Sequence, residues 1–315
     1  MGSAPNYPLQ SGYQLLNYRI DRLLSRGGFS LVYRARDESG VTVAIKEYLP
    51  SGLALREQGD VIHATSADNI ALFRHGMRCF FEEGRALARI VHPNVVRVLN
   101  FFRANETVYL VMQYERGRTL QEQIQTYKHA ISENFIRHIF GHLLNGLREV
   151  HTHRLLHLDI KPANIYIRLD KSPLLLDFGA VRQTLIVDDK RLKPMYTPGF
   201  APPEQYRNHD LLGPWSDIYS VGASMFSCLA GHAPQAADGR MKIDKLESAK
   251  KLWGGRFSDG LLEIVDWCLQ LEHTDRPQSV FSLQKALLSR KLTPVKRTFF
   301  GNMRFAIEKI GSRRP

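Results

Sequence analysis

Four polar side chains in one stretch of the sequence have the types and spacing that chemistry on a phosphate needs. The run 157–164, with the letters HLDIKPAN, contains Asp159, Lys161 and Asn164, and Asp177 follows thirteen residues after Asn164. Short strands predicted at 165–168 and 174–176 would return Asp177 toward Asp159. As separate residues they have ordinary explanations as caps or turn formers. Together they suit phosphoryl transfer, which depends on positioning and charge neutralisation.

A pair of small residues near the N-terminus could bring backbone groups close to an anion. Gly27 and Gly28 stand in the run 25–30, with the letters SRGGFS, which we expect at a hairpin tip. Without a Cβ, their N–H groups can approach phosphate oxygens closely. A plain turn explains this motif equally well. The sequence contains no glycine loop that ends in Gly-Lys-Ser or Gly-Lys-Thr, which excludes a Walker-type P-loop.

A lysine in an apolar strand supplies the next candidate. Lys46 ends the run 43–46, with the letters VAIK, and its ammonium group needs an acidic partner if it is buried. Glu82 and Glu83, on the helix predicted to follow, are the candidates. The alternative is a lysine whose head group reaches the solvent.

The elements that must position these residues change in type along the chain. Alternating β-branched and aromatic residues predict strands early, whereas apolar residues at helical spacing dominate later. We therefore expect an α+β fold with a strand-rich N-terminal lobe and a helical C-terminal lobe, joined near 113–117. The predicted strands are 31–36, 42–48, 98–102 and 108–112; the predicted helices are 69–91, 120–127, 135–150 (N-cap Ser132), 217–229 (cap Ser216), 259–271 and 279–289.

Composition excludes several protein classes. The 315 residues are 43% hydrophobic and 23% charged, which is ordinary for a globular chain and unlike a disordered or fibrous one. The three cysteines are far apart, so neither a disulfide framework nor a zinc site is indicated. No uncharged run is long enough to span a membrane and no signal-peptide pattern is present, so we expect a cytoplasmic protein.

These segments follow one another in the same order as in the eukaryotic-type (Hanks-type) serine/threonine protein kinases. The sequence is similar to that family over about residues 12 to 290. The glycine loop, the VAIK lysine, the loop of Asp159 and Asn164, and the Asp-Phe-Gly run that begins at Asp177 carry the resemblance. The runs TPGFAPPE at 197–204, DIYSVG at 217–222 and DRP at 275–277 extend it. The run KEYLP at 46–50 suggests a bacterial member.

The resemblance implies an ATP-dependent protein kinase with a two-lobed fold and a catalytic role for each matched residue. Lys46 would hold the α- and β-phosphates and pair with Glu83, and Asp159 would be the catalytic base. Lys161 would steady the γ-phosphate, and its position favours serine and threonine over tyrosine as acceptors. Mg²⁺, with Mn²⁺ as a substitute, would be held by Asn164 and Asp177.

The resemblance also places the nucleotide and the supporting residues. The ATP-binding set would be Gly27, Gly28, Phe29, Val32, Ala44, Lys46, Met112 as gatekeeper, Gln113 and Glu115 in the hinge, and Tyr166 under the adenine. The activation segment would contain Thr184, Thr197 and Glu204. The structural residues would be His157 beneath the Asp-Phe-Gly turn, Asp217 anchoring the catalytic loop, and Arg276 paired with Glu204. A metal site made by His151, His153 and His157 is disfavoured.

Two departures from the family pattern affect activation and nucleotide binding. Leu158 stands where many members have an arginine that receives an activation-segment phosphate. We therefore expect that phosphorylating Thr184 or Thr197 is not required for activity. Tyr166 replaces the usual aliphatic residue and would narrow the adenine pocket.

An insert separates Lys46 from the helix of Glu83. Residues 49–68 make this connection longer than a minimal member needs, and 61–64 could add an edge strand. The insert is either a surface loop or a docking element for a regulatory partner that sets the position of the helix. The expected organisation is an N-terminal extension at 1–12, an N-lobe at 13–114, a C-lobe at 115–290 and a tail at 291–315.

Half of the net charge of +12 lies in that tail, which has seven basic residues against Glu308. Its apolar residues Phe299, Phe300, Met303, Ile307 and Ile310 fall near helical spacing. A basic amphipathic segment of this kind can lie peripherally on an anionic membrane, pack on the protein, or bind a partner. Nucleic acid is not expected, because the rest of the chain is close to neutral.

Two rival functions remain open at this point. A pseudokinase scaffold would bind nucleotide and partners without transfer, but Lys46, Asp159, Asn164 and Asp177 are all present, which favours an enzyme. A small-molecule kinase is disfavoured by the recognisable activation segment. We expect protein substrates with serine or threonine acceptors, with autophosphorylation as an accompanying reaction.

Overall fold

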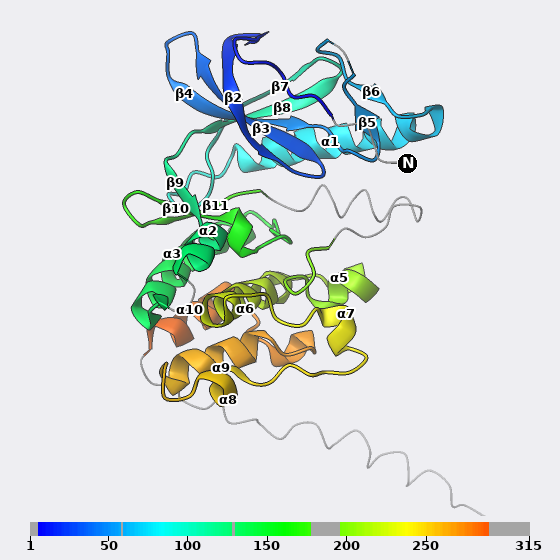
Figure 1. Ribbon diagram of the computed structural model, residues 1–315. Coiled ribbons are helices and arrows are strands. Elements are labelled where there is room, and N and C mark those ends of the chain that lie inside the picture. The colour runs from blue at the N-terminus through cyan, green and yellow to red at the C-terminus, as the bar shows by residue number, and fades with distance from the viewer. Residues whose placement is uncertain (1–5, 58, 128–129, 178–195, 290–315) are drawn as a thin grey trace, which may run out of the picture.

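The computed structural model describes residues 6–57, 59–127, 130–177 and 196–289. Its upper part in Figure 1 is a curled antiparallel sheet with one long helix, and its lower part is a group of helices. The α+β, two-lobed expectation is therefore confirmed. The chain crosses from one part to the other between Gln113 and Gly117.

The N-lobe sheet has the strand order β1-β2-β3-β4-β8-β7, and every neighbouring pair is antiparallel. Strand β2 went undetected in the sequence because bulges after Ile20 and Leu23 interrupt its pairing with β3 and hence its alternation. The strands are β1 (Gln14–Leu15), β2 (Tyr18–Arg26), β3 (Ser30–Asp37), β4 (Thr42–Tyr48), β7 (Val98–Ala104) and β8 (Thr107–Gln113).

One face of this sheet packs against helix α1 (Ile70–Leu87). The ring of Tyr48 on β4 stacks on Phe73 at 5.8 Å between centroids and contacts Phe80 at 5.4 Å. The helix ends four residues earlier than predicted, because the chain turns at Ala88 and a proline follows at position 93. The short 3₁₀ helix η1 (Ala67–Asn69) leads into it.

The insert at 49–68 is folded against the N-lobe. Leu53, Ala54, Arg56 and Ile62 are all buried. The edge strand considered for 61–64 is not added to the main sheet: β6 (His63–Ala64) pairs with β5 (Ala54–Leu55) in a two-stranded sheet of its own. Both lie beside α1 in Figure 1. A plain surface loop does not describe this segment, because its apolar side chains enter the N-lobe core.

The C-lobe is built around helix α6 (Pro214–Ala230), which is buried on all sides from Ser216 to Leu229. The predicted cap at Ser216 is wrong. The helix begins three residues earlier, after Gly213, because Pro214 suits the first helical position. Around it lie α2 (Leu120–Tyr127), α3 (Glu133–Thr152, N-cap Ser132), α5 (Pro203–Arg207), α7 (Ala237–Arg240), α8 (Ala249–Trp253), α9 (Asp259–Cys268), α10 (Val280–Leu288), and the 3₁₀ helices η4 (His209–Leu211) and η5 (His273–Asp275).

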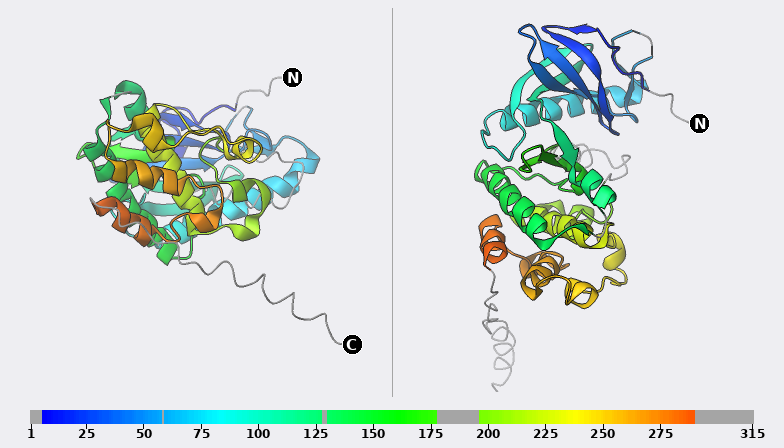
Figure 2. Two further views of the ribbon diagram at one scale, coloured as in Figure 1. Left: turned by 90° about the horizontal axis from the view of Figure 1, so that it is seen from below. Right: turned by 60° about the vertical axis from the view of Figure 1, so that its left-hand side comes forward.

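A three-stranded sheet lies where the two lobes meet, as the right-hand view of Figure 2 shows. Its order is β11 (Pro173–Leu175), β10 (Ile165–Arg168) and β9 (Gly117–Thr119). The backbone of Val96 donates to Leu175 O at 3.0 Å and that of Leu175 to Asn94 O at 2.9 Å. These bonds join the segment before β7 to β11. The sheet therefore fixes the start of β10, which follows Asn164, and the end of β11, which precedes Asp177.

No helix in the described part of the chain is both long enough and apolar enough to cross a membrane. The tail at 291–315 lies outside the described residues, as does Thr184.

Candidate active site

Asp159 is the centre of a group of polar contacts at the start of η3 (Pro162–Asn164). Lys161 Nζ lies 3.0 Å from each carboxylate oxygen of Asp159. Asn164 Nδ2 donates to Asp159 Oδ2 at 3.0 Å and to its backbone oxygen at 2.9 Å. The turn of η3 brings these three side chains together, as the sequence spacing suggested.

Thr197 approaches the same carboxylate from a segment distant in sequence. Its hydroxyl donates to Asp159 Oδ1 at 3.0 Å and accepts from Lys161 Nζ at 2.8 Å. The structure thus already holds one threonine hydroxyl within hydrogen-bond distance of both Asp159 and Lys161. The sequence predicted Thr197 as part of the activation segment but gave no sign of this contact.

Asp217 holds the loop from below, from the first turn of α6. Its carboxylate accepts from the backbone N–H groups of His157 at 2.9 Å and Leu158 at 2.7 Å, and it contacts His151 Nε2 at 2.8 Å. Burial alone would raise the pKa of Asp217, but the hydrogen bond and charge of His151 outweigh it and the pKa lies below its ordinary value. His151 was noted in the sequence only as a disfavoured metal ligand.

The loop is held in a strained backbone conformation. Leu158 has φ of 61° and Asp177 has φ of 48°, in the left-handed region that costs a side-chain-bearing residue about 1 kcal/mol or more. Gln205 Nε2 donates to Leu158 O at 2.9 Å, so both polar groups of the Leu158 backbone are bonded. Such strain persists only where the surroundings fix it, and the hydrogen bonds from Asp217 and Gln205 do so here.

His157 is fully buried and links the two halves of the site. Its Nε2 lies 2.9 Å from Leu176 O, and its Nδ1 accepts from the backbone N–H of Asp159 at 3.3 Å. This pattern requires the neutral ring with its proton on Nε2. Burial lowers the pKa of His157, although the nearby carboxylates of Asp217, Asp159 and Asp177 act in the opposite direction. His157 therefore contacts Leu176, the residue directly before Asp177.

Lys46 reaches across from the N-lobe. Its Nζ lies 2.9 Å from Asp177 Oδ1 and 5.6 Å from the ring centre of Phe80 on α1. The ammonium therefore faces the end of β11, where Asp177 lies. The sequence predicted Glu83 as the partner of Lys46, and that pairing stays a prediction. Lys46 is only 8% exposed, so it is not a lysine that reaches the solvent. Glu82 pairs with Arg85 on the helix surface.

The predicted nucleotide-binding residues line the strands next to Lys46. Val32 lies opposite Lys46 in the β3–β4 register, and Ala44 lies opposite Met112 in the β4–β8 register. Met112 is buried in a small apolar cluster that also contacts Ala44. The register therefore places the predicted gatekeeper and both adenine-contacting residues on adjacent strands.

Further predicted nucleotide-binding residues belong to the glycine loop and the hinge. Gly27, Gly28 and Phe29 connect β2 to β3, and Gly27 N donates to Ser30 O at 2.9 Å. Neither glycine adopts positive φ. In the hinge, Gln113 Nε2 donates to Glu115 Oε1 at 3.0 Å.

Tyr166, from β10, is half-buried below the hinge. Its hydroxyl lies 3.5 Å from Glu115 O. Burial raises the pKa of this phenol, which therefore stays neutral. The contact brings an aromatic ring to the edge of the predicted adenine pocket.

A buried ion pair joins α5 to the segment that follows η5. Arg276 donates to Glu204 Oε1 at 2.8 Å and to Oε2 at 3.0 Å, and both residues are at most 5% exposed. Ser216, at the start of α6, donates to the same Glu204 carboxylate at 2.7 Å. The predicted pairing of Glu204 with Arg276 is therefore present. The contribution of Ser216 was missed, because its position was taken as a helix cap.

The oxygen donors of the site suit a divalent hard cation. Asn164 offers a carboxamide and Asp177 a carboxylate, the ligand types that Mg²⁺ prefers, usually with few protein ligands and with phosphate oxygens completing its shell. Among the described residues no group of three His, Cys, Asp or Glu could hold a metal ion. A carboxylate and a carboxamide oxygen fit a magnesium ion whose remaining ligands come from outside the protein.

Comparison with known proteins gives matches over most of the chain. A family model described as protein kinase domain matches residues 18–288. The solved structure of the PpkA-294 apo form is 34% identical with a TM-score of 0.82, covering 89% of this chain and 99% of that one. The kinase domain of Mycobacterium tuberculosis PknI, at 19% identity and a TM-score of 0.67, supports the fold alone.

Two curated relatives are longer than this chain. Serine/threonine-protein kinase B of Synechocystis is 28% identical over 286 residues, which cover 86% of this chain and 46% of that protein. Serine/threonine-protein kinase PLK4 of Danio rerio is 25% identical over 229 residues, 72% of this chain and 22% of that protein. The chain thus spans less than half the length of these relatives.

Proposed function

This chain belongs to the protein kinase family, and on that premise we propose that it transfers the γ-phosphate of ATP to serine and threonine hydroxyls of proteins. One observation carries the proposal: Asp159, Lys161 and Asn164 form a hydrogen-bonded group, which His157 links to Leu176, the residue before Asp177 of the Lys46–Asp177 ion pair. The relatives named as serine/threonine kinases support the choice of acceptor.

Each of these side chains has a distinct task in the proposed reaction. Asp159 orients the acceptor hydroxyl and takes its proton as the oxygen bonds to the γ-phosphorus and the bond to the ADP oxygen breaks. Lys161, 3.0 Å from Asp159, neutralises charge that develops on the transferred group. Lys46 binds the remaining phosphates with its ammonium group.

Asn164 and Asp177 would hold Mg²⁺, or Mn²⁺ in its place, which supplies charge neutralisation on the phosphates. In the present structure Asp177 contacts Lys46. The ammonium group thereby holds the carboxylate in place before substrate arrives.

We also propose that activity does not depend on phosphorylation of the activation segment. The backbone at Leu158 is fixed by Asp217 and Gln205, and the Thr197 hydroxyl is engaged with Asp159. The loop therefore has supports that need no phosphate. Treatment of the purified protein with a phosphatase should leave turnover unchanged within about twofold; loss of turnover would contradict this part of the proposal.

The test of the proposed function is direct phosphate transfer. The protein is incubated with labelled ATP and Mg²⁺, alone and with a generic acceptor protein, beside Asp159→Asn and Lys46→Met. We expect label on serine or threonine only with the wild-type protein. Equal label in all three samples would point to a contaminant, and none in any sample would favour a nucleotide-binding scaffold.

The basic tail at 291–315 is the basis for a separate proposal about location. Its net charge of +6 and its spaced apolar residues suit an anionic membrane surface. Co-sedimentation with vesicles that contain anionic lipid, compared with neutral vesicles and with a chain ending at 291, tests it. Equal sedimentation of both chains would rule it out.

A further inference from the structure

A buried ion pair joins the insert to the strand that carries Lys46. Glu47, the next residue on β4, is completely buried, and Arg56 of the insert is 2% exposed and bonds to it through both Nη atoms. We propose that Arg56 is a positioning residue for Lys46 and acts through Glu47. The inference rests on the proposed function, because it assigns the insert a part in holding ATP.

The carboxylate of Glu47 is bonded from three directions. Tyr33 on β3 donates to Oε2 at 2.7 Å, and Tyr109 on β8 donates to Oε1 at 2.5 Å. Arg56 Nη1 donates to Oε2 at 3.1 Å. Both tyrosines are fully buried, and Tyr109 lies directly opposite Glu47 in the register. Of these donors only Arg56 is cationic, so the charge of Glu47 is balanced only while the insert is seated.

Arg56 in turn holds the outer segments in place. Its Nε donates to Asp60 O and its Nη1 to Tyr7 O, both at 3.1 Å, and its backbone N–H donates to Asn6 Oδ1 at 3.0 Å. The backbone of Leu9 donates to the Tyr33 hydroxyl at 3.1 Å. The guanidinium therefore joins the N-terminal segment, the insert and the sheet at one buried point.

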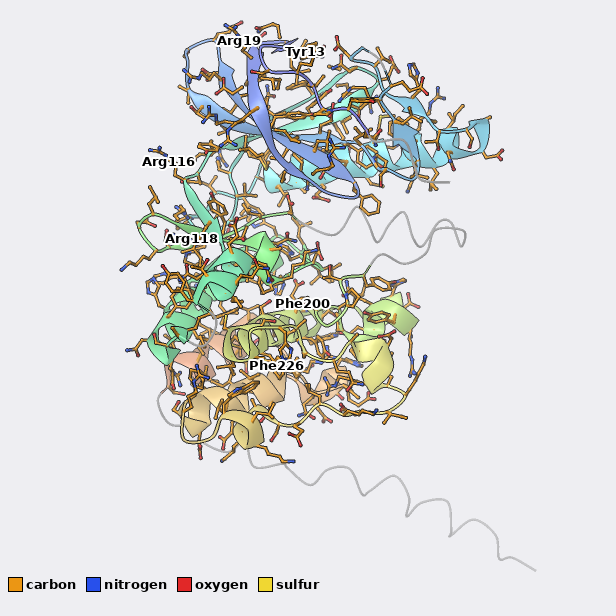
Figure 3. The ribbon with its side chains drawn as sticks, viewed as in Figure 1. Tyr13, Arg19, Arg116, Arg118, Phe200 and Phe226 are labelled. Atoms are coloured by element: carbon orange, nitrogen blue, oxygen red, sulfur yellow. The ribbon has the colours of Figure 1, made fainter. Side chains whose placement is uncertain are left out.

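A second chain of contacts reaches the same carboxylate from the β7–β8 turn. Asn105 Nδ2 donates to the Tyr109 hydroxyl at 3.0 Å, and Asn105 Oδ1 accepts from Tyr13 at 3.3 Å. Asn105 O accepts from Ile62 N of the insert at 3.0 Å. Tyr13 is labelled at the top of the N-lobe in Figure 3. The insert is thus anchored to the sheet both through Arg56 and through Ile62.

Lys46 and Glu47 project from opposite faces of β4, because successive side chains of a strand alternate. Lys46 faces α1 and the cleft, where it contacts Phe80 and Asp177. Removing Arg56 would leave a carboxylate buried without a counter-ion, which is strongly unfavourable. The strand would then shift or admit water, and the ammonium group on its other face would move with it.

The experiment measures nucleotide affinity and stability separately. Arg56→Met is compared with wild type by calorimetric titration with Mg²⁺ and the non-hydrolysable analogue AMPPNP, well below the unfolding midpoint of each protein. The matched control is Arg240→Met, which removes another buried arginine, paired with Asp244 in the C-lobe. Arg56→Lys tests rescue by a smaller cation.

We expect Arg56→Met to bind AMPPNP about tenfold more weakly and to raise the KM for ATP similarly, with the KM for the acceptor protein within roughly twofold of wild type. Arg240→Met should lower the unfolding midpoint without changing nucleotide affinity. Arg56→Lys should recover part of the affinity. If Arg56→Met binds AMPPNP as tightly as wild type, or if Arg240→Met weakens binding equally, the inference is overturned.

A second variant covers the case in which Arg56→Met does not fold. The double variant Arg56→Met with Glu47→Gln buries no net charge, so its stability should recover while the coupling to the insert is lost. Weaker AMPPNP binding in the folded double variant supports the positioning role, and wild-type binding overturns it. Failure of the wild-type protein to bind AMPPNP would instead contradict the proposed function.

Discussion

The ammonium nitrogen of Lys46 lies 2.9 Å from Oδ1 of Asp177, and this ion pair links the N-lobe sheet to the small sheet below it. Lys46 belongs to the central strand of the N-lobe, whereas Asp177 follows the last strand of the small sheet between the lobes. The pair brings together the group that would bind phosphates and a group that would bind a cation. The site is therefore assembled by the approach of two separately folded sheets.

Asp177→Asn should impair catalysis much more than folding. The Asp177 side chain is 36% exposed, and asparagine keeps an oxygen that can accept a hydrogen bond from the buried Lys46 ammonium, so the free energy of unfolding should change by only about 1 kcal/mol. Loss of its charge should lower kcat at least about 100-fold and weaken the dependence on Mg²⁺. Mg²⁺ titrations of activity, paired with urea unfolding, measure both effects. A variant with normal kcat would remove Asp177 from the site.

Thr197→Ala should lower kcat while leaving ATP binding unchanged. The hydroxyl bonds to the carboxylate of Asp159 and to the ammonium of Lys161, and hydrogen bonds to charged groups contribute about 1.5–3 kcal/mol. We expect a loss of roughly 10- to 100-fold in kcat at constant KM for ATP. Thr197→Ser keeps the hydroxyl and should retain most activity. Equal losses in both variants would show that the methyl group, not the hydroxyl, matters.

Arg276→Met should destabilise the C-lobe strongly. It leaves the Glu204 carboxylate buried without its cation, which typically costs about 3–5 kcal/mol. The control is Arg85→Met, because the Arg85–Glu82 pair is more than half exposed on its arginine side and should contribute under about 1 kcal/mol. Chemical denaturation of the two variants measures the difference. Similar free energies of unfolding would contradict the assigned role of the buried pair.

Acid should destabilise the protein in two steps. The pKa of His157 is lowered in the folded state, so below about pH 6.5 the unfolded chain binds a proton that the folded chain does not, and stability falls as pH falls. The pKa of Asp217 is also lowered, so its contribution is present above its unfolded pKa near 3.8 and is lost below it. Both groups make the unfolded state the better proton acceptor.

His157→Gln provides the check on the first step. Glutamine cannot titrate, so the variant should show a flatter dependence of the free energy of unfolding on pH between about 5 and 6.5 than the wild-type protein. His153→Gln is the control, because His153 is partly exposed at the end of α3. An unchanged slope in His157→Gln would assign the pH dependence to another group.

Regular elements were the part of the fold that local sequence could predict. The bounds of β4 and α2 agree with the predicted 42–48 and 120–127, because alternation and helical spacing are properties of neighbouring residues. The bulged β2 and the short β5 escaped prediction, and the strand considered at 61–64 pairs with β5 rather than with the main sheet, because strand pairing depends on distant segments.

The insert shows most clearly what local reasoning could not reach. Its sequence allowed either a loop or a docking element, and its arginine resembled any other surface cation. Only packing against the sheet reveals that Arg56 balances a carboxylate adjacent to Lys46. A signal was nevertheless present in Glu47, an acidic residue in a largely apolar strand. A charge buried there requires a partner, for the same reason that Lys46 does.

By itself the sequence determined which chemical groups the site contains and the order in which the chain delivers them, because residue type and spacing are local. The tertiary structure alone decided which of these groups pair: Lys46 with Asp177, Thr197 with Asp159, and Arg56 with Glu47. Pairing depends on the distance between distant segments and on the burial of each charge. Both are set only when the two lobes have packed.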